Sequence, residues 1–244
     1  MHKKPISVVI PVFNEAGNIE KLLDEINVAL TEKFETFEVI LVNDQSQDET
    51  ESVLKRFLKE SNSKHIKLIT NEENLGQGVS IYRGIKAAAY SCIAIMDGDL
   101  QVDPRDIYTF YTHMQNNNLD FVCSRRSTRE DNDRIFRHLP SIIGNALIRT
   151  LLGGVFTDVG SSLKIIPKEN ALFIKPFRHY HRYISIYLYH QKLTCAELEI
   201  IHRPRSYGQS NYSIFKFVKV LPELVTVYRG IKDMKSSIRL NGQS

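Results

Sequence analysis

The 244-residue sequence contains no tryptophan and only three cysteines, Cys92, Cys123 and Cys195. The cysteines lie far apart and have no CxxC spacing, which argues against a zinc ribbon or a disulfide framework and favours a reducing compartment. The histidines form no HExxH pattern. His179 and His181 are spaced by one residue, but no cysteine or acid is near them in the sequence, so we expect them at the surface.

An uninterrupted apolar run of about 18 residues is also missing, so we expect no transmembrane helix. The nearest stretches, residues 142–156 and 214–227, are interrupted by polar and charged residues and are typical of amphipathic or core helices. Residues 1–4 lead directly into a strand-like segment, so we expect no signal peptide. That segment is not followed by GxGxxG, which argues against a Rossmann dehydrogenase.

The net charge of +4 is unevenly distributed. Residues 1–120 carry a net charge of −7, residues 121–200 one of +5, and residues 201–244 one of +6. The second half is therefore a candidate surface for phosphates or anionic lipid, with solvated helix faces as the alternative. The basic residues are spread through structured segments without a nucleic-acid-binding module, so we expect no nucleic-acid partner.

Apolar, β-branched segments alternate with helical patterns through the first hundred residues. Four segments are expected to be strands: 6–11, 37–42, 66–70 and 92–96. The alternation predicts an α/β fold with a mostly parallel central sheet flanked by helices on both faces. Ligands of such sheets bind outside the carboxyl ends of the strands, which is where Glu15, Asp44, Asp97 and Asp99 occur.

The sharpest local pattern is Asp97-Gly98-Asp99 at the end of the fourth strand. Two carboxylates in this arrangement suit Mg²⁺ or Mn²⁺, which bind few protein carboxylates and complete their shell with substrate phosphates. An isolated DxD is weak evidence, because most such pairs are solvated turn acids. The preceding strand and the following residues 100–104 (LQVDP) strengthen it.

Four segments in the first half resemble the motifs of family 2 glycosyltransferases, in the same order. They are residues 10–15 (IPVFNE), 41–50 (LVNDQSQDET), 74–78 (NLGQG) and 96–101 (MDGDLQ). The DxDLQ form, with Gln101 and Pro104, is similar to that of dolichyl- and polyprenyl-phosphate sugar synthases, including the dolichol-phosphate mannose synthases.

The second half continues this resemblance to about residue 215, with departures. Matching segments are 123–125 (CSR), 137–145 (RHLPSIIGN), 158–163 (DVGSSL) and 205–212 (RSYGQSNY). Asn43 replaces the first acid of a usual pair, Ser162 replaces a glycine, and Asn211 replaces a lysine that would contact a phosphate. The lack of tryptophan excludes the (Q/R)xxRW signature of processive polysaccharide synthases.

The resemblance implies the GT-A fold, with a Rossmann-like nucleotide-sugar-binding half followed by an acceptor-binding half. We place these halves at residues 1–120 and 121–228 of a single domain, with a C-terminal tail at 229–244. The implied activity is that of a metal-dependent inverting glycosyltransferase that moves a hexose from a GDP- or UDP-sugar to a polyprenyl or dolichyl phosphate. A cytoplasmic location is expected, peripheral at the membrane face, with direct contact or a membrane partner.

The resemblance also implies the residues of the donor site. Asp99 would be the main ligand of Mg²⁺ or Mn²⁺, with Asp97 and Gln101 close by, although Asp97 would alternatively hold a ribose or sugar hydroxyl. The positions that would hold the nucleotide are Pro11, Phe13, Glu15, Val42, Asp44 and Gly98. Phe13 would pack near the base, and core packing is the alternative for a single aromatic residue after a strand.

A lipid phosphate is already ionised and needs cations rather than a general base, and arginine suits bidentate phosphate binding. Arg125, Arg137 and Arg205 stand at motif positions and are our candidates. Arg126, Arg134 and Arg182 are further cations that could contribute to such a site, with an exposed position on the surface as the favoured alternative. Asp158 would orient arginines or a loop, or would be the base for a hydroxyl acceptor.

Two other functions remain open at this point. One is a family 2 glycosyltransferase that acts on a sugar hydroxyl of a glycan or glycolipid, with Asp158 as base. The other is a non-catalytic nucleotide-binding scaffold subunit. Tyr180, Tyr183, Tyr187 and Tyr189 would form a rim near lipid or, alternatively, pack within a helix bundle.

Overall fold

The computed structural model describes residues 5–61, 63–126, 146, 148–204 and 216–241, with the side chains of 216–222 and 238–241 left aside. Two candidate anion-binding residues, Arg137 and Arg205, lie outside the described residues, as does Arg134.

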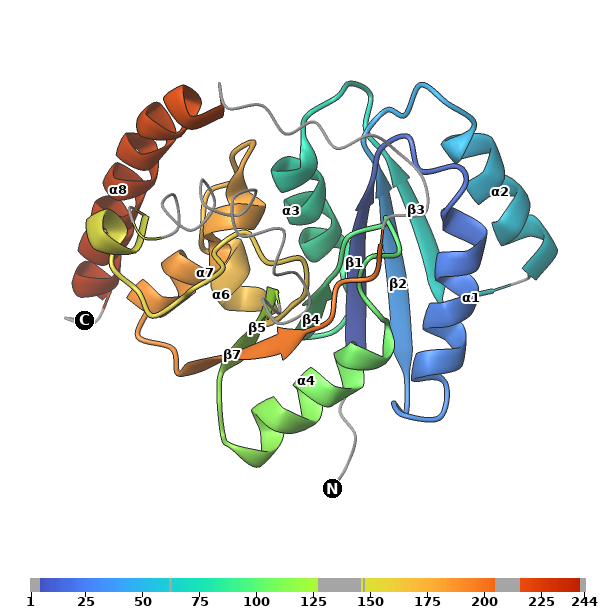
Figure 1. Cartoon of the computed structure of the whole chain (residues 1–244), viewed down its shortest axis with the longest axis horizontal. Helices are drawn as coiled ribbons and strands as arrows, with labels where there is room; N and C mark the ends of the chain where they lie inside the picture. The colour runs from blue at the N-terminus through green and yellow to red at the C-terminus, as the bar shows by residue number, and fades with distance from the viewer. Residues whose placement is uncertain (1–4, 62, 127–145, 147, 205–215, 242–244) are drawn as a thin grey trace.

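A seven-stranded sheet forms the centre of the molecule (Figure 1). The strands are β1 (Ile6–Val12), β2 (Phe37–Asn43), β3 (Ile66–Thr70), β4 (Cys92–Ile95), β5 (Phe121–Arg126), β6 (Lys164–Pro167) and β7 (Cys195–Ile200). Their order is β3-β2-β1-β4-β6-β5-β7. β6 runs antiparallel to both of its neighbours, and the other pairings are parallel. The predicted mostly parallel sheet and its first four strands are confirmed.

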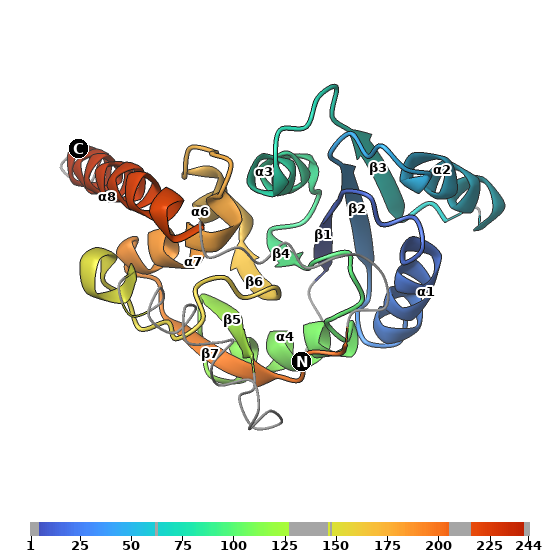
Figure 2. The same ribbon diagram turned by 45° about the horizontal axis from the view of Figure 1, so that its top comes forward.

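Helices cover both faces of this sheet (Figure 2). They are α1 (Ile19–Leu30), α2 (Thr50–Ser61), α3 (Gln77–Ala87), α4 (Arg105–Asn116), α6 (Lys168–Leu172), α7 (Tyr180–His190) and α8 (Lys216–Asn241). Alternate side chains of β1 explain the two layers, because Val8 packs into the core under α1, α2 and α4, whereas Val9 packs into the core under α3, α6 and α7.

The outermost helix, α8, packs against α7. Leu224, Val227, Ile231 and Met234 are buried at helical spacing, so one face of α8 joins the core. The expected boundary between residues 228 and 229 falls inside this helix. No helix among the described residues is long and apolar enough to cross a membrane.

Three of the four tyrosines considered for a lipid-facing rim, Tyr180, Tyr183 and Tyr187, are buried in α7. Their side chains contact Phe177 and the core beneath α8. The rim is therefore wrong and the packing alternative is correct, because seven of the eleven residues of this helix are buried between the sheet and α8.

Candidate active site

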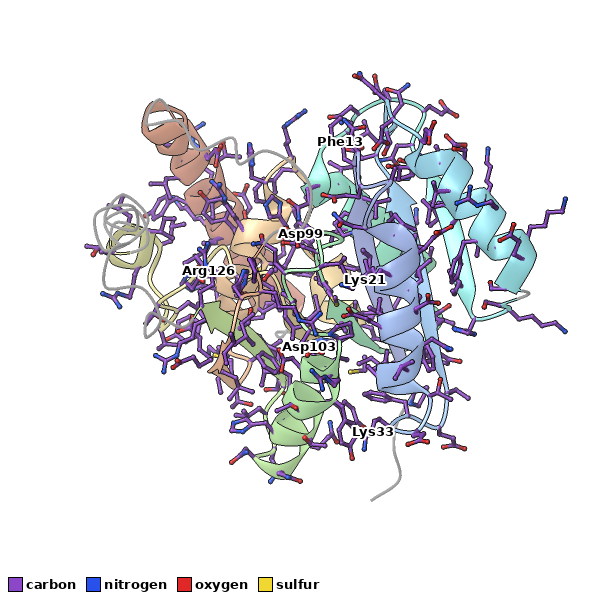
Figure 3. All side chains as sticks on the ribbon, turned by 45° about the vertical axis from the view of Figure 1, so that its right-hand side comes forward. Phe13, Lys21, Lys33, Asp99, Asp103 and Arg126 are labelled. Carbon is purple, nitrogen blue, oxygen red and sulfur yellow. The ribbon has the colours of Figure 1, made fainter. Side chains whose placement is uncertain are left out.

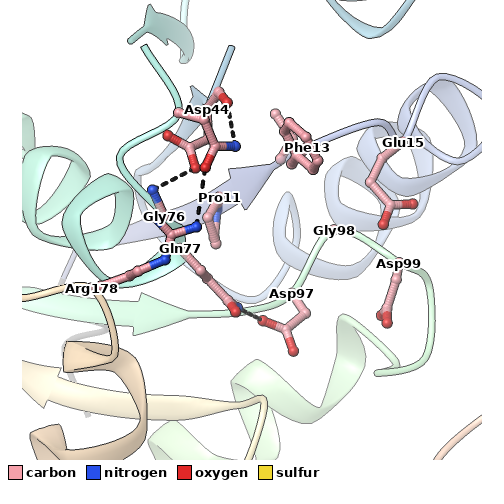
Figure 4. Close-up of a pocket in the computed structure, with 12 residues that line it drawn as sticks. Pro11, Phe13, Glu15, Asp44, Gly76, Gln77, Asp97, Gly98, Asp99 and Arg178 are labelled. Carbon is pink, nitrogen blue, oxygen red and sulfur yellow. Dashed lines mark hydrogen bonds between the residues drawn. The ribbon is translucent and has the colours of Figure 1, made fainter. Parts of the chain in front are cut away.

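A pocket of about 360 Å³ opens where β1, β2 and β4 end (Figure 4). It is lined by Pro11, Val12, Phe13, Glu15, Asp44, Asn74, Gly76, Gln77, Asp97, Gly98, Asp99 and Arg178. The loops after these three strands each contain a non-glycine residue with positive φ, namely Asn14, Gln45 and Leu100. Such strained backbone turns the chain sharply and is common where side chains are held for function.

Phe13 forms part of the pocket rim and is 42% exposed. Core packing of this side chain is therefore wrong. An exposed aromatic face beside a polar pocket can stack on a planar ring such as a nucleobase. Glu15 lies in the same pocket and accepts a hydrogen bond of 2.6 Å from the side-chain amide of Asn18.

Asp44 is buried and its carboxylate holds the loop between β3 and α3. It accepts hydrogen bonds from Asn71 Nδ2 at 2.7 Å, from Leu75 N at 2.9 Å and from Gly76 N at 2.8 Å. Asn74 also donates from its side chain to the carbonyl oxygen of Asp44. Three donors to one carboxylate fix its position, so Asp44 shapes the wall of the pocket as well as lining it.

Asp97 and Asp99 face the same pocket from the loop after β4. Asp97 Oδ1 accepts a hydrogen bond from Gln77 Nε2 at 2.7 Å, and Asp99 Oδ1 accepts one from the backbone N–H of Gln101 at 3.2 Å. Gly98 between them lies close to β1, since a Cβ there would stand 3.1 Å from Val12 Cγ1. Close packing on β1 thus keeps the two carboxylates at the pocket floor.

The donor set fits a hard divalent cation that a substrate helps to bind. Of the four carboxylates that line the pocket, Asp97 and Asp99 come from one loop, and no group of three or more His, Cys, Asp or Glu suited to a metal occurs among the described residues. Mg²⁺ and Mn²⁺ are commonly held by one or two carboxylates together with substrate phosphates and waters. The geometry therefore suits a cation that arrives with a diphosphate.

Two predicted donor-site residues are not among those that line the pocket. Val42 is fully buried in the core, close to Gly84 of α3. The side-chain amide of Gln101 donates to the carbonyl oxygen of Arg203, at 3.4 Å, and the backbone of Arg203 donates back to Gln101. Gln101 thus contacts the segment after β7, while its backbone N–H bonds Asp99, and its place beside a metal stays a prediction.

Arg178 belongs to the pocket although no sequence motif pointed to it. It precedes α7, donates to Asn74 Oδ1 at 3.4 Å, and lies over Gly76. The backbone of residues 177–178 also covers Gly78, since Gly78 N donates to the carbonyl oxygen of Arg178. Glycines such as Gly76 and Gly78 can mark a place where another backbone segment approaches closely. The sequence does not show which distant segment approaches, so it did not predict Arg178.

On the β5 side of the pocket, Asp158 forms a bidentate ion pair with Arg126. Arg126 Nε lies 2.8 Å from Asp158 Oδ2, and Arg126 Nη2 lies 3.0 Å from Asp158 Oδ1. Burial opposes ionisation of Asp158, but the hydrogen bonds and charge of Arg126 outweigh it and lower the pKa of the carboxyl. Asp158 is therefore placed to orient an arginine.

The two neighbouring arginines of β5 have different partners. Arg125, at the motif position, is half-exposed and 3.4 Å from Glu199. Arg126, whose side chain is 38% exposed, is the one that Asp158 holds. The cause is the alternation of a strand, which sends consecutive side chains of β5 to opposite faces. In the view of Figure 3, Phe13, Asp99 and Arg126 follow one another from the β1 side to the β5 side.

His202 is a second residue that the sequence did not single out. It interacts electrostatically with Arg126, Asp99 and Asp158, and its Nε2 lies 3.1 Å from Ser162 Oγ. Burial, with the nearby Arg126, lowers the pKa of His202 despite the two acids. The imidazole thus interacts both with an acid of the donor pocket and with the Arg126–Asp158 pair.

An α/β sheet with this strand order, and with acids gathered at the carboxyl ends of its strands, defines the class of GT-A glycosyltransferases. The family model for "Glycosyl transferase family 2" matches residues 7–172. The chain belongs to glycosyl transferase family 2. The resemblance found in the sequence motifs is confirmed.

Two curated relatives show the same resemblance over 91% of this chain. Dodecaprenyl-phosphate galacturonate synthase of Rhizobium johnstonii is 30% identical, and the match covers 66% of it. Undecaprenyl-phosphate 4-deoxy-4-formamido-L-arabinose transferase of Photorhabdus laumondii is 29% identical, and the match covers 67% of it. The chain thus spans about two thirds of the length of these relatives.

A solved structure supports the fold. Glucosyl-3-phosphoglycerate synthase from Mycobacterium tuberculosis, in complex with Mn²⁺, UDP-glucose and phosphoglyceric acid, superposes with a TM-score of 0.67 at 18% identity. The match covers 94% of this chain and 80% of that one. The predicted GT-A fold is confirmed.

Proposed function

We propose that the protein transfers a sugar from a nucleoside diphosphate donor to a polyprenyl phosphate. An oxygen of the lipid phosphate attacks the anomeric carbon, the bond to the nucleoside diphosphate breaks, and the configuration inverts. The observation that carries this proposal is one pocket that combines an exposed aromatic ring, Phe13, with the paired acids Asp97 and Asp99. The names of the two curated relatives support the class of acceptor.

The nucleotide-sugar donor would contact residues on two sides of the pocket. Phe13 and Pro11 would contact the base, and Glu15 would accept a hydrogen bond from the ribose. The N-terminus of α3, with Gln77 and Arg178, adds positive potential where a diphosphate would lie. Arg178 would attract the diphosphate of a GDP-sugar and of a UDP-sugar alike, so it does not distinguish between the two bases. The identity of the base is determined by experiment.

We further propose Mg²⁺ or Mn²⁺ at Asp97 and Asp99. Such a cation, when bound, neutralises the charge that develops on the leaving diphosphate. Asp99, which interacts with His202 as the Arg126–Asp158 pair does, would be the principal ligand. The Mn²⁺ and UDP-glucose in the structurally similar synthase support this choice of cofactor.

The residues around Asp158 favour a phosphate over a hydroxyl as the acceptor group. A hydroxyl acceptor needs a base, and the lowered pKa and bidentate ion pair of Asp158 make it a poor one. A phosphate instead needs a cation, and Arg126 is held by Asp158 near His202 and Asp99. Arg125 remains a proposed second cation, and Arg137 and Arg205 stay predictions.

We propose peripheral contact with the cytoplasmic face of the membrane, through α8. Val225 and Tyr228 are exposed on its outer side, and Arg229, Lys232 and Lys235 are exposed beside them. Aromatic and aliphatic side chains flanked by cations suit the interface of an anionic bilayer.

The test is a transfer assay with purified protein, polyprenyl phosphate in detergent, and Mg²⁺ or Mn²⁺. The donors are GDP-mannose, UDP-glucose, UDP-galacturonate and the UDP-activated formamido-arabinose. We expect sugar in the lipid phase with one donor, and none when a chelator removes the cation. Donor binding without transfer across the panel would contradict the proposal.

A further inference from the structure

Lys164 is a buried cation at the junction between the two halves of the sheet. It begins β6, opposite Ile95 of β4 and Cys123 of β5, and is only 3% exposed. Its ammonium group donates a hydrogen bond to the carbonyl oxygen of Ser161. An apolar side chain of similar length would fill this place without the cost of taking a charge out of water. The packing of the sheet therefore does not by itself explain a lysine.

Burial lowers the pKa of the Lys164 ammonium group, and two acids from different segments oppose that shift. They are Asp97, which follows β4, and Asp158, which precedes β6. Together with Lys164 and Arg126 they form a group of two cations and two anions. His181 of α7 and Cys123 also face Lys164. Burial with the charge of Lys164 lowers the pKa of His181 to about 3, and burial raises that of Cys123 to about 12, so neither adds charge near neutral pH.

We propose that Lys164 is a positioning residue that fixes Asp97 of the donor pocket relative to Asp158, and thereby relative to Arg126. Asp97 and Asp158 are 61 residues apart in the sequence and reach the site from different strands, so a shared buried cation is a direct way to keep both in place. This inference rests on the proposed function, because it matters only if donor and acceptor meet between these acids.

The first test replaces the charge and keeps the hydrogen bond. Lys164→Gln can still donate to Ser161 but has no charge, and we expect kcat to fall by about tenfold or more at saturating donor. The Kd of the nucleoside diphosphate, measured with a chelator and no metal, should change by less than about twofold, because the proposed contacts of base and ribose are Pro11, Phe13 and Glu15. Lys164→Met, which also lacks the charge, should show the same loss.

Lys168→Met is the matched control. Lys168 stands four residues further on, and its ammonium group likewise donates to a carbonyl oxygen, that of Ala88 at 2.5 Å, outside the pocket. We expect its kcat to equal that of the wild type. An equal loss in the Lys164 and Lys168 variants would contradict the inference, as would an equal loss of metal-free nucleotide binding and of kcat in Lys164→Gln.

A double variant separates positioning from general stability. In an Asp158→Asn background, Lys164→Gln should lower kcat by less than about threefold, because one of the two acids that it aligns is already neutral. If the double variant loses kcat by the product of the two single losses, the inference is overturned. A wild type that transfers no sugar to polyprenyl phosphate would instead contradict the proposed function, whereas full activity of Lys164→Gln would contradict this inference alone.

Discussion

At the scale of single residues, the acids of the pocket differ in what already holds them. Asp44 accepts three hydrogen bonds from the protein, which fixes a loop. Asp97 accepts a hydrogen bond from Gln77 Nε2 at 2.7 Å and Asp99 accepts one from Gln101 N at 3.2 Å, and both line the pocket from the loop after β4. Asp44 therefore shapes the pocket, and Asp97 and Asp99 stay our proposed metal ligands.

Replacing Asp99 with Asn should lower the transfer rate by about 100-fold or more, because a neutral amide is a weaker ligand for a divalent cation. The melting temperature should stay within about 2 °C of the wild type, since the change is nearly isosteric. Asp24→Asn, on the exposed face of α1, is the control and should leave both unchanged. Wild-type turnover in Asp99→Asn would contradict its role as metal ligand.

Replacing Phe13 with Ala should weaken nucleotide binding by about tenfold, the loss of roughly 1.4 kcal/mol from one stacked base. Isothermal titration with the nucleoside diphosphate measures it. Phe173→Ala is the matched control, because Phe173 is similarly exposed, at 46% against 42%, and lies outside the pocket. Equal affinities for the two variants would show that Phe13 does not contact the base.

At the scale of elements, the pocket depends on how closely α3 approaches the segment before α7. A Cβ on Gly78 would stand 2.5 Å from the carbonyl oxygens of both Phe177 and Arg178. Only glycine allows this contact, and the contact brings Arg178 to the pocket. The wall opposite Phe13 is therefore set by packing between elements about 100 residues apart in the sequence.

Gly78→Ala should lower the free energy of unfolding by about 2 kcal/mol through overpacking, and should weaken nucleotide binding by displacing Arg178. Urea denaturation and titration measure the two effects. Gly160→Ala is the control, because a Cβ there meets no described atom within 4 Å. If both variants unfold at the same urea concentration, the close approach is not stabilising.

The sequence predicted the elements whose signals are local. Apolar runs predicted the strands β1 to β4. The polar residues after these strands predicted Asp44, Asp97 and Asp99 as pocket residues, because parallel strands end at one edge of the sheet. The direction of β6 was not predictable from its four residues. Neither was the burial of His181 Nδ1, in a residue expected at the surface, because it depends on where α7 packs.

At the scale of the whole molecule, an ion-pair network ties the end of β7 to the first half. Arg203 lies 2.6 Å from Glu25 of α1 and 2.6 Å from Asp103, which precedes α4 (Figure 3 marks Asp103). Burial raises the pKa of Asp103, but hydrogen bonds from Arg105 and Arg203 outweigh it and lower the pKa to about 2. The segment after β7 is thereby fastened to α1 and to the start of α4.

Because this pKa is lower in the folded chain than its usual 3.8, the stabilisation is present above about pH 4 and is lost as the pH falls to about 2. Between these values the wild type should lose about 2 kcal/mol more free energy of unfolding than Asp103→Asn. Urea denaturation at a series of pH values measures this. If the free energy of unfolding falls equally between about pH 4 and about pH 2 in the two proteins, the stabilising role of the ion-pair network is contradicted.

The acceptor side of the site was less predictable than the donor side. Asp158 was singled out from a motif as a residue that orients arginines or a loop, but the motif does not show that Arg126 is the arginine it holds, because it does not show which face of β5 meets Asp158. His202 and Lys164 act through groups that come from several segments, and such convergence is a property of the folded chain. The expected division at residue 120 stays a prediction.

The central claim is that the nucleophile is a lipid phosphate, and one comparison tests it most directly. Polyprenyl phosphate and the matching polyprenol are offered with the same donor and metal, and the product is analysed by mass spectrometry and ³¹P NMR. We predict a sugar-phosphate linkage on polyprenyl phosphate, with inverted configuration, and no product on polyprenol. A glycosylated polyprenol that disappears in Asp158→Asn would contradict the claim and would make Asp158 a base.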